Sequence, residues 1–394
     1  MSSRRRRRAG GWDSIVPDRS HVVIAGVSTR ALAASAARAG YRVTAVDAFG
    51  DADLAAVAAV VPLRREPGQP FVADEAARAV RSVPADFAAY TSSFENHPSA
   101  VLILARGRRL LGNPANIIRG VRDPFALARA LRLRGFEVPL TRASAPLARN
   151  RRRWLLKPRH SGGGHGTIAW RPGTGVPRRA YLQERIAGTP GSIVFAADGR
   201  RAVPLGLTRQ LVGLPAFGAS GFRYCGSLLA GHAPLFPRQA ELLARAGELA
   251  GAVTEAFGLR GLNTVDFIAR RGVPVPIEVN PRYSASMELI ERATGLLLFR
   301  VHAESCAGRL PRLPGAPAEV WGKAIVFARR ATVIDDPTAW GIDLADVPHR
   351  GERIARGRPV CTVFARGRTG EACTARLARA ARAVYAPAAV RGAA

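Results

Sequence analysis

The stretch that most restricts the fold of this chain is HVVIAGVSTRALAASAARAGYRVTAVDAFGD, residues 21–51. An apolar run ends at Gly26, an alanine-rich helical segment follows and ends near Gly40, and the apolar run YRVTAVDAF comes directly after it. Short apolar runs without polar alternation are typical of strands that are buried on both faces of a parallel sheet. The pattern predicts a strand, a crossover helix and a second strand, and so a doubly wound α/β region.

Two features of this unit raise the question of a dinucleotide site. Gly26, Val27 and Ser28 form only a fragment of the glycine fingerprint, because the later glycines are absent. Asp47 ends the second strand, where an acid that binds a ribose would stand. An α/β domain that binds no phosphate accounts for the same residues, and we favour that interpretation.

Beyond this unit the pattern changes twice. The α/β alternation continues to about residue 121, and from Trp154 onward short strands are linked by glycine turns, as in an antiparallel sheet. An amphipathic helix over 238–258, two strands and two helices follow, and the proline-rich RLPRLPGAPAEV precedes a strand-rich end. We predict a disordered basic tail (1–20), a Rossmann-like α/β domain (21–121), an α+β domain (122–310) and a small strand-rich C-terminal domain (318–394).

The charge of the chain does not by itself identify a partner. The net charge is +30, from 59 basic and 29 acidic residues, and such an excess can indicate nucleic-acid binding. The arginines are spread along the whole chain, with clusters only in the tail and at Arg151–Arg153, and aromatic residues make up 7%. We therefore do not expect specific nucleic-acid recognition, and an anionic small substrate fits the charge equally well.

Cysteine spacing and hydropathy bear on the compartment. The four cysteines form no C-x-x-C pair, which suits reduced thiols better than disulfides or a zinc site; they are Cys225, Cys306, Cys361 and Cys373. The sequence contains no run of about 18 apolar residues, so we expect no membrane-spanning helix. The basic N-terminus lacks the apolar region of a secretory signal. We expect a cytoplasmic protein.

The segment LLKPRHSGGGHG, residues 155–166, combines a rare lysine with a glycine loop. Lys157 and Lys323 are the two lysines among the 59 basic residues, so a position that keeps lysine stands out. Glycines between two strands let backbone N–H groups approach a phosphate closely, and Lys157 can reach the same phosphates. The alternative is a flexible hairpin with an incidental lysine.

The segment NTVDFIARRGVPVPIEVNPR, residues 263–282, predicts a hairpin that carries oxygen ligands. Glu278 and Asn280 share one strand face because side chains alternate along a strand, and Asp266 on the neighbouring strand can join them. Two carboxylates and an amide oxygen suit Mg²⁺ together with nucleotide phosphates. Arg282 falls on the same face. The alternative is a solvated hairpin face.

Taken in order, these segments resemble the ATP-grasp family over roughly residues 110 to 308. The resemblance implies that Lys157 and the glycine loop hold the ATP phosphates, that Glu184 and Ile186 in LQERI meet adenine, and that Arg282 acts on phosphate with Lys157 as the second catalytic cation. It also makes Asp266, Glu278 and Asn280 metal ligands and residues 21–121 a pre-ATP-grasp domain. The loop residues meant are Ser161, Gly162, Gly163, Gly164 and Gly166.

Two positions depart from the family pattern. Many relatives have an earlier lysine that contacts ATP, whereas this chain reads VRDPFALA, so either Arg122 replaces the lysine or the contact is missing. The ribose position after QERIAGTPG holds no acid, which leaves Ser192 as the candidate.

The resemblance implies an ATP- and Mg²⁺-dependent carboxylate–amine ligase that uses two Mg²⁺ or Mn²⁺ ions. The carboxylate becomes an acylphosphate and an amine displaces the phosphate, so both partners are small molecules, glutamate being one candidate. The spacing of the hairpin is most similar to the branch of the pyrrolysine ligase and the tyramine–glutamate ligase. A homodimer, an inactive nucleotide-binding regulator and a basic protein associated with nucleic acid stay open as alternatives.

Overall fold

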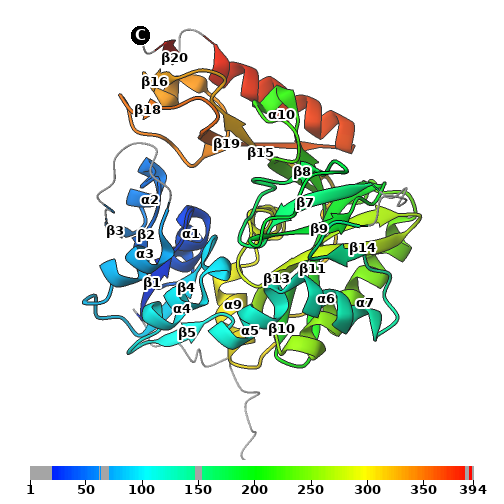
Figure 1. The fold of residues 1–394 in the computed structure, drawn as a ribbon. Coiled ribbons are helices and arrows are strands. Elements are labelled where there is room, and N and C mark those ends of the chain that lie inside the picture. Colours follow the sequence, from blue (N-terminus) through cyan, green and yellow to red (C-terminus); the bar gives the residue numbers. More distant parts are fainter. Residues whose placement is uncertain (1–19, 62, 64–70, 147–152, 387–389, 393–394) are drawn as a thin grey trace, which may run out of the picture.

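The computed structural model describes residues 20–61, 63, 71–146, 153–386 and 390–392. Residues 1–19 of the predicted basic tail lie outside this description, as do Arg151 and Arg152 of the arginine cluster. A parallel α/β region, an antiparallel body and a C-terminal region follow one another along the chain (Figure 1). This is the fold class that the sequence predicts, and that prediction is confirmed.

Five parallel strands form the sheet of the first region, in the order β3-β2-β1-β4-β5. The strands are β1 (His21–Ala25), β2 (Arg42–Val46), β3 (Ala59–Val61), β4 (Phe87–Tyr90) and β5 (Arg109–Leu111). The helices are α1 (Arg30–Arg38), α2 (Ala52–Ala55), α3 (Ala73–Ala79), α4 (Pro98–Leu104) and α5 (Ala115–Arg122). The predicted strand, helix and strand are therefore β1, α1 and β2.

Burial on both faces explains the uninterrupted apolar run of β1. Val22 and Ile24 pack in one cluster with Leu32 of α1, whereas Val23 and Ala25 pack in another with α3 and α4. Alternate side chains of a strand point to opposite faces, so a strand covered on both sides needs apolar residues throughout.

An eight-stranded sheet forms the body, in the order β14-β13-β10-β11-β12-β15-β19-β17. Its strands are β10 (Thr189–Asp198), β11 (Ala202–Val212), β12 (Tyr224–Leu229), β13 (Arg260–Arg270), β14 (Val273–Asn280), β15 (Val320–Phe327), β17 (Leu344–Ala345) and β19 (Pro359–Gly367). The predicted amphipathic helix is α7 (Gln239–Phe257), whose Leu242, Leu249 and Val253 are buried against this sheet. Helices α8 (Met287–Thr294) and α9 (Leu298–Cys306) follow the hairpin β13–β14.

A smaller sheet, in the order β6-β9-β7-β8, carries the glycine loop. Its strands are β6 (Thr141–Arg142), β7 (Trp154–Pro158), β8 (Ile168–Ala169) and β9 (Ala180–Glu184), and α6 (Pro124–Arg132) precedes them. The glycine loop joins β7 to β8, so it is a connection between strands, as the sequence predicts.

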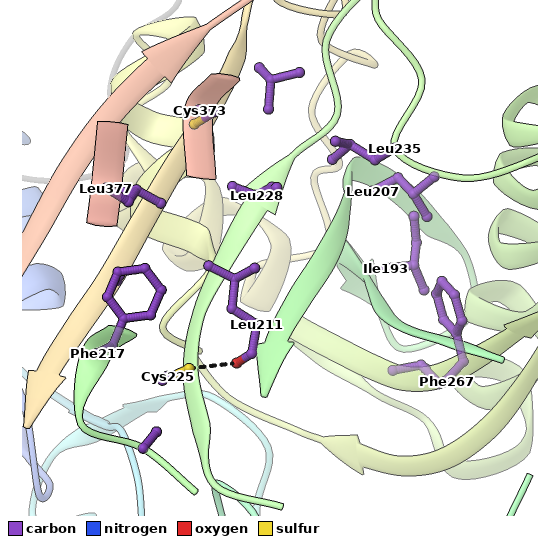
Figure 2. Packing of buried hydrophobic residues seen from close by; sticks show 14 of the residues in the cluster. Ile193, Leu207, Leu211, Phe217, Cys225, Leu228, Leu235, Phe267, Cys373 and Leu377 are labelled. Atoms are coloured by element: carbon purple, nitrogen blue, oxygen red, sulfur yellow. Dashed lines mark hydrogen bonds between the residues drawn. The ribbon is translucent and has the colours of Figure 1, made fainter. Parts of the chain in front are cut away.

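The C-terminal region shares the sheet and the core of the body. Strands β15, β19 and β17 extend the large sheet beyond β12, and α10 (Gly370–Tyr385) packs against it. Figure 2 shows Cys373 and Leu377 of α10 beside Leu228 of β12. The sequence indicates strands here but neither this helix nor the continuity of the sheet.

Short elements complete the chain. A three-stranded sheet contains β16 (Thr332–Ile334), β18 (Arg353–Ile354) and β20 (Val390–Gly392), and there are 3₁₀ turns η1 (Phe94–Asn96), η2 (Pro215–Phe217) and η3 (Pro337–Trp340). Within the described residues, no helix is both long enough and apolar enough to cross a membrane.

Candidate active site

A cavity of about 1310 Å³ lies where the three regions meet, and nearly all of the predicted site residues line it. The ones on its wall are Lys157, Ser161, Gly162, Gly163, Gly164, Glu184, Ile186, Ser192, Asp266, Glu278, Asn280 and Arg282. Gly166, the last glycine of the loop, is not part of the wall. Residues up to 125 positions apart in the sequence are thus brought to one cavity (Lys157 and Arg282).

The glycine loop is pressed against the start of β12. Gly163 and Gly164 have φ angles of +60° and +76°, which favour glycine. A Cβ atom on Gly164 would stand 1.9 Å from the carbonyl oxygen of Phe222. The amide of Tyr224 donates to the carbonyl of Gly163 at 3.0 Å. Gly164 is therefore required by packing, whether or not a phosphate approaches the loop.

Lys157 projects from β7 toward β9. Its Nζ donates to Oε1 of Gln183 at 3.1 Å and lies 5.9 Å from the centroid of the Tyr181 ring. Gln183 in turn donates to the carbonyl of Ile277 on β14 at 3.2 Å. Among the described residues these partners are neutral, so the ammonium keeps an unbalanced charge that an anionic ligand can meet.

The hairpin β13–β14 brings the three predicted metal ligands together. Asp266 is opposite Glu278 in the ladder, and Nδ2 of Asn280 donates to Oδ2 of Asp266 at 3.0 Å. Burial, and next the charge of Glu278, raise the pKa of Asp266 to about 7. Two adjacent carboxylates that repel each other fit a divalent cation.

The same geometry limits which cation fits. Among the described residues, no three His, Cys, Asp or Glu side chains gather as a metal cluster. An ion held by Asp266, Glu278 and Asn280 must therefore complete its shell from elsewhere. Mg²⁺ is commonly bound in this way, by one or two carboxylates together with phosphate oxygens and water.

Arg282 is anchored by a residue that sequence reasoning missed. Its Nη2 donates to Glu95 at 2.6 Å and to Oδ1 of Asn280 at 3.2 Å. Burial alone would raise the pKa of Glu95, but the guanidinium of Arg282 outweighs it and holds that pKa below its usual range. Glu95 follows β4, at the carboxyl end of a parallel strand, which is where open α/β sheets bind ligands. The position of Glu95 just after a predicted parallel strand was the sequence signal that could have identified it.

Arg122 connects the glycine loop to the hairpin. Its Nη2 donates to the carbonyl of Ser161 and to Oδ1 of Asn96, both at 2.9 Å, and its Nη1 donates to the carbonyl of Val279 at 3.1 Å. Nη1 is 3.9 Å from the carboxylate of Glu278. Arg122 thus stands beside both halves of the candidate phosphate site.

The residues expected around adenine and ribose have protein partners. Oε2 of Glu184 accepts from the amide of Leu140 at 3.2 Å. The buried hydroxyl of Ser192 shares a hydrogen bond with Thr208 at 2.6 Å, and Ser192 is opposite Asp266 in the ladder. Ser192 consequently lies beside the carboxylate pair, which does not favour a ribose contact. Ile186 directly follows β9 and lines the cavity.

The carboxylate of Asp47 accepts hydrogen bonds from residues of its own α/β region. Oδ2 accepts from the amide and the hydroxyl of Thr29 at 2.5 and 2.8 Å, and Oδ1 accepts from the amides of Phe49 and Gly50 at 2.7 and 3.1 Å. These bonds hold the loops after β1 and β2 together. They agree with the interpretation that this region binds no dinucleotide.

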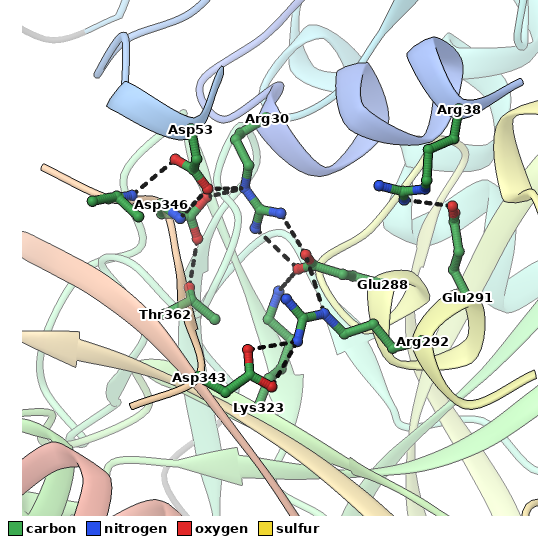
Figure 3. Close-up of polar contacts among 11 residues, drawn as sticks. Arg30, Arg38, Asp53, Glu288, Glu291, Arg292, Lys323, Asp343, Asp346 and Thr362 are labelled. Carbon is green, nitrogen blue, oxygen red and sulfur yellow. Dashed lines mark hydrogen bonds and ion pairs between the residues drawn. The ribbon is translucent and has the colours of Figure 1, made fainter. Parts of the chain in front are cut away.

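Figure 3 shows a buried ion-pair network between the regions of the chain. Three of its residues, Arg30, Lys323 and Asp346, line the cavity. Nζ of Lys323 donates to Glu288 at 2.7 Å, and Arg30 of α1 forms an ion pair with the same carboxylate. Nε of Arg30 also donates to Asp346 at 3.0 Å, and Asp346 accepts from Thr362 at 2.5 Å. The network joins all three regions of the chain and gives Lys323 a partner that the sequence could not indicate.

Comparison with known proteins identifies the domain that carries this site. Residues 121–286 match the ATP-grasp domain family. An uncharacterised protein of Methanocaldococcus jannaschii is 28% identical over 119 residues, so the match spans 30% of this chain and 30% of that relative. The expected resemblance is therefore confirmed for these residues.

Solved structures show the same fold along almost the whole chain. The ADP complex of N5-carboxyaminoimidazole ribonucleotide synthetase has a TM-score of 0.69 at 16% identity, over 94% of this chain and 97% of that one. The L-amino acid ligase of Bacillus licheniformis has a TM-score of 0.65 at 15% identity, over 93% and 98%. This chain thus carries an ATP-grasp domain at residues 121–286, inside a three-region fold that it shares with these enzymes.

Proposed function

We propose that this protein is an ATP- and Mg²⁺-dependent ligase that joins a carboxylate to an amine. The observation that carries the proposal is the single cavity shared by Lys157, the glycine loop, the Asp266–Glu278–Asn280 set and Arg282. Cations that can bind phosphate and oxygen ligands that can hold a metal ion lie there together. The L-amino acid ligase that shares the fold is, by its name, an enzyme of this class.

In the proposed reaction a carboxylate oxygen of the first substrate attacks the γ-phosphorus of ATP, and the bond to the bridging oxygen of ADP breaks. The amine nitrogen then attacks the acyl carbon, the bond from that carbon to the phosphate oxygen breaks, and the proton that the amine loses passes to the released phosphate or to water. Such a transfer needs positioning and neutralisation of charge more than acid–base groups. Lys157 and the loop amides are assigned to the phosphates, and Arg282, held by Glu95, to the charge that develops on the transferred group.

The metal site is assigned to Asp266, Glu278 and Asn280. Two Mg²⁺ or Mn²⁺ ions held there with the nucleotide would supply charge neutralisation for its phosphates. We assign Glu184 and Ile186 to adenine and Arg122 to the role of the earlier lysine of the family. Ser192 stays the candidate for ribose, although its hydroxyl is engaged with Thr208.

We further propose that the protein belongs to the ligase branch related to the pyrrolysine and tyramine–glutamate ligases. We also propose the domain limits 21–121, 122–310 and 318–394, a cytoplasmic location and a homodimer. Light scattering of the purified chain tests the homodimer. The alternative of an inactive regulator predicts nucleotide binding without any release of ADP.

The experiment that tests the function is a hydroxylamine trap. The protein is incubated with ATP, Mg²⁺, hydroxylamine and a panel of amino acids and dicarboxylates, and both ADP and hydroxamate are measured. An acylphosphate yields one hydroxamate for each ADP. Absence of both products with every carboxylate contradicts the proposal.

Glu278→Gln and Asn280→Ala should each abolish this turnover while the far-UV circular dichroism spectrum stays unchanged. Loss of one ligand of a phosphate-bridging ion removes several kcal/mol of transition-state stabilisation, on the order of 3–4 kcal/mol or a hundredfold and more in rate. Glu255→Gln, on an exposed position of α7, removes the same charge and should leave turnover unchanged. Near-normal ADP release by either hairpin variant rules out the metal assignment.

A further inference from the structure

Asp51, at the N-terminal end of α2, is an acid on the cavity wall for which the described residues provide no ion-pair partner. The residue is 7% exposed and lines the cavity. Its Oδ2 is buried and has no hydrogen-bond partner among the described residues. Its side chain does not cap α2 either. A buried carboxylate oxygen without a partner costs free energy, on the order of 1–3 kcal/mol or more, so its presence calls for a ligand.

The neighbouring acids are all satisfied by the protein. Asp47 accepts four hydrogen bonds, as described above. Asp53 accepts from the amides of Asp346 and Val347 at 3.0 and 2.9 Å, and Asp346 is held by Arg30 and Thr362. Arg30 itself is shared with Glu288. Arg30, the cation that these acids share, is therefore already paired with Glu288 and Asp346, and among the described residues Asp51 differs from Asp47, Asp53 and Asp346 in having a buried oxygen without a partner.

The surroundings of Asp51 favour a positively charged ligand. Burial, and then the charges of Asp346, Asp47, Asp53 and Glu352, raise the pKa of Asp51 to about 9. A cation placed beside Asp51 would reverse this shift, because an opposite charge at close range favours the ionised carboxylate. The negative charge that remains on this wall attracts a cation to the same place.

The number of carboxylate oxygens near Asp51 that lack a protein partner favours an organic cation over a metal ion as the ligand. Mg²⁺ is usually held by one or two carboxylates together with phosphate oxygens and water. The phosphates are assigned to the glycine loop and the hairpin, not to Asp51, and the carboxylates of Asp47, Asp53 and Asp346 already have protein partners. One open carboxylate suits an ammonium group, whose N–H donors form charge-assisted hydrogen bonds. Val27, Ala31 and Phe49 of the same region also line the cavity, so the first region contributes apolar as well as acidic surface to it.

The size of the cavity leaves room for such a ligand beside a nucleotide. Small-molecule sites usually enclose roughly 300–1,000 Å³, and this cavity encloses about 1310 Å³. Asp51 belongs to the first region, whereas Asp266 and Glu278 belong to the hairpin of the body. Ser284 and Ser286, at the start of α8, line the cavity as well.

We propose that Asp51 binds the ammonium group of one of the two substrates, so that the ligase selects a substrate with a primary amine. This inference rests on the proposed function and assigns a substrate class to the first-region end of the same cavity. The ammonium can belong to an amino acid that is activated at its carboxylate or to the amine substrate, whose nitrogen attacks the acylphosphate only after it has lost a proton. Both sources share one chemistry, and the experiment separates them.

The test compares the parent protein with Asp51→Asn, which keeps the shape of the side chain but removes its charge. Matched probes differ only in the ammonium group: L-glutamate with glutarate, and L-alanine with propionate, each trapped by hydroxylamine. Ethylenediamine then replaces hydroxylamine as the nucleophile, with the best carboxylate. Glu255→Gln is the control for loss of one negative charge, and the KM for ATP is measured throughout.

An ammonium on the activated substrate predicts that Asp51→Asn raises the KM of the amino acid at least tenfold, while the desamino acid and ATP change less than twofold. An ammonium on the nucleophile predicts normal hydroxamate formation and a KM for ethylenediamine raised at least tenfold. Unchanged KM values for every ammonium-bearing probe overturn the inference even if the ligase activity is present.

Calorimetry separates failure of this inference from failure of the proposed function. The same probes are titrated into the parent protein and Asp51→Asn with ADP and Mg²⁺ present. If no probe yields ADP or hydroxamate, the ligase proposal fails, yet the subsite still stands if the parent binds L-glutamate or ethylenediamine at least tenfold more tightly than the variant does. Equal binding, or none by the parent protein, overturns the subsite.

Discussion

Lys157 and Lys323, the two lysines of the chain, have opposite surroundings. Lys157 is half-buried beside neutral groups on the cavity wall, whereas Lys323 is 4% exposed and paired with Glu288. Lys157→Arg should therefore lower kcat/KM for ATP at least tenfold, because a planar guanidinium is wider than an ammonium. A displacement of the nucleotide by about 1 Å can cost on the order of a hundredfold in rate. Steady-state ADP release at varied ATP measures the effect.

Lys323→Arg is the comparison for that prediction. Because Lys323 is bound to Glu288 rather than to a neutral acceptor, we expect Lys323→Arg to lower kcat/KM for ATP less than Lys157→Arg does. If both variants behave like the parent protein, Lys157 does not bind the phosphates.

At the scale of elements, the side chain of His302 connects α9 to two sheets by hydrogen bonds. Its Nδ1 accepts from the amide of Leu262 on β13 at 2.9 Å, and its Nε2 is 3.1 Å from the carbonyl of Leu111 on β5. This pairing requires the neutral ring, and burial lowers the pKa of His302 to about 4. The unfolded chain, with a pKa near 6.5, binds the proton more readily, so stability should fall as the pH drops from about 6.5 toward 4. The loss reaches roughly 3 kcal/mol at the lower limit.

Guanidinium unfolding at pH 7.0, 5.5 and 4.5 measures this effect, with His302→Gln as the matched variant. An amide can make both hydrogen bonds without titrating in this range. The difference in free energy of unfolding between parent and variant should shrink or reverse as the pH falls. A difference that does not change with pH contradicts the role given to His302.

For the whole molecule, Glu288 of α8 holds the three regions together. It is 6% exposed and balances Arg30 from the first region and Lys323 from β15. Burial alone raises its pKa, but Lys323 and Arg30 lower it well below the usual range. Glu288→Gln should destabilise the protein by about 3–5 kcal/mol, because the buried Lys323 loses its counter-charge and Arg30 keeps only the carboxylates of the first and C-terminal regions. Chemical denaturation measures this, and Glu255→Gln should stay within about 0.5 kcal/mol of the parent. A Glu288→Gln protein of parental stability would show that the network is not needed to join the regions.

Sequence periodicity was enough to predict many of the helices and strands, although not α10, and part of the site. The apolar run of β1, the glycine loop after Lys157, and the shared face of Glu278 and Asn280 follow from neighbours along the chain, since two-residue alternation and glycine's backbone freedom are local properties. The other contacts of the site and the extent of the sheet depend on the tertiary structure. Glu95 contacts Arg282 across 187 positions, and Lys323 contacts Glu288. Asp51 has an oxygen without a partner among the described residues, and β15 and β19 extend the sheet of the body. Which charges are desolvated, and which of them find a counter-charge, depends on side chains brought together by long-range packing, and no local pattern records that.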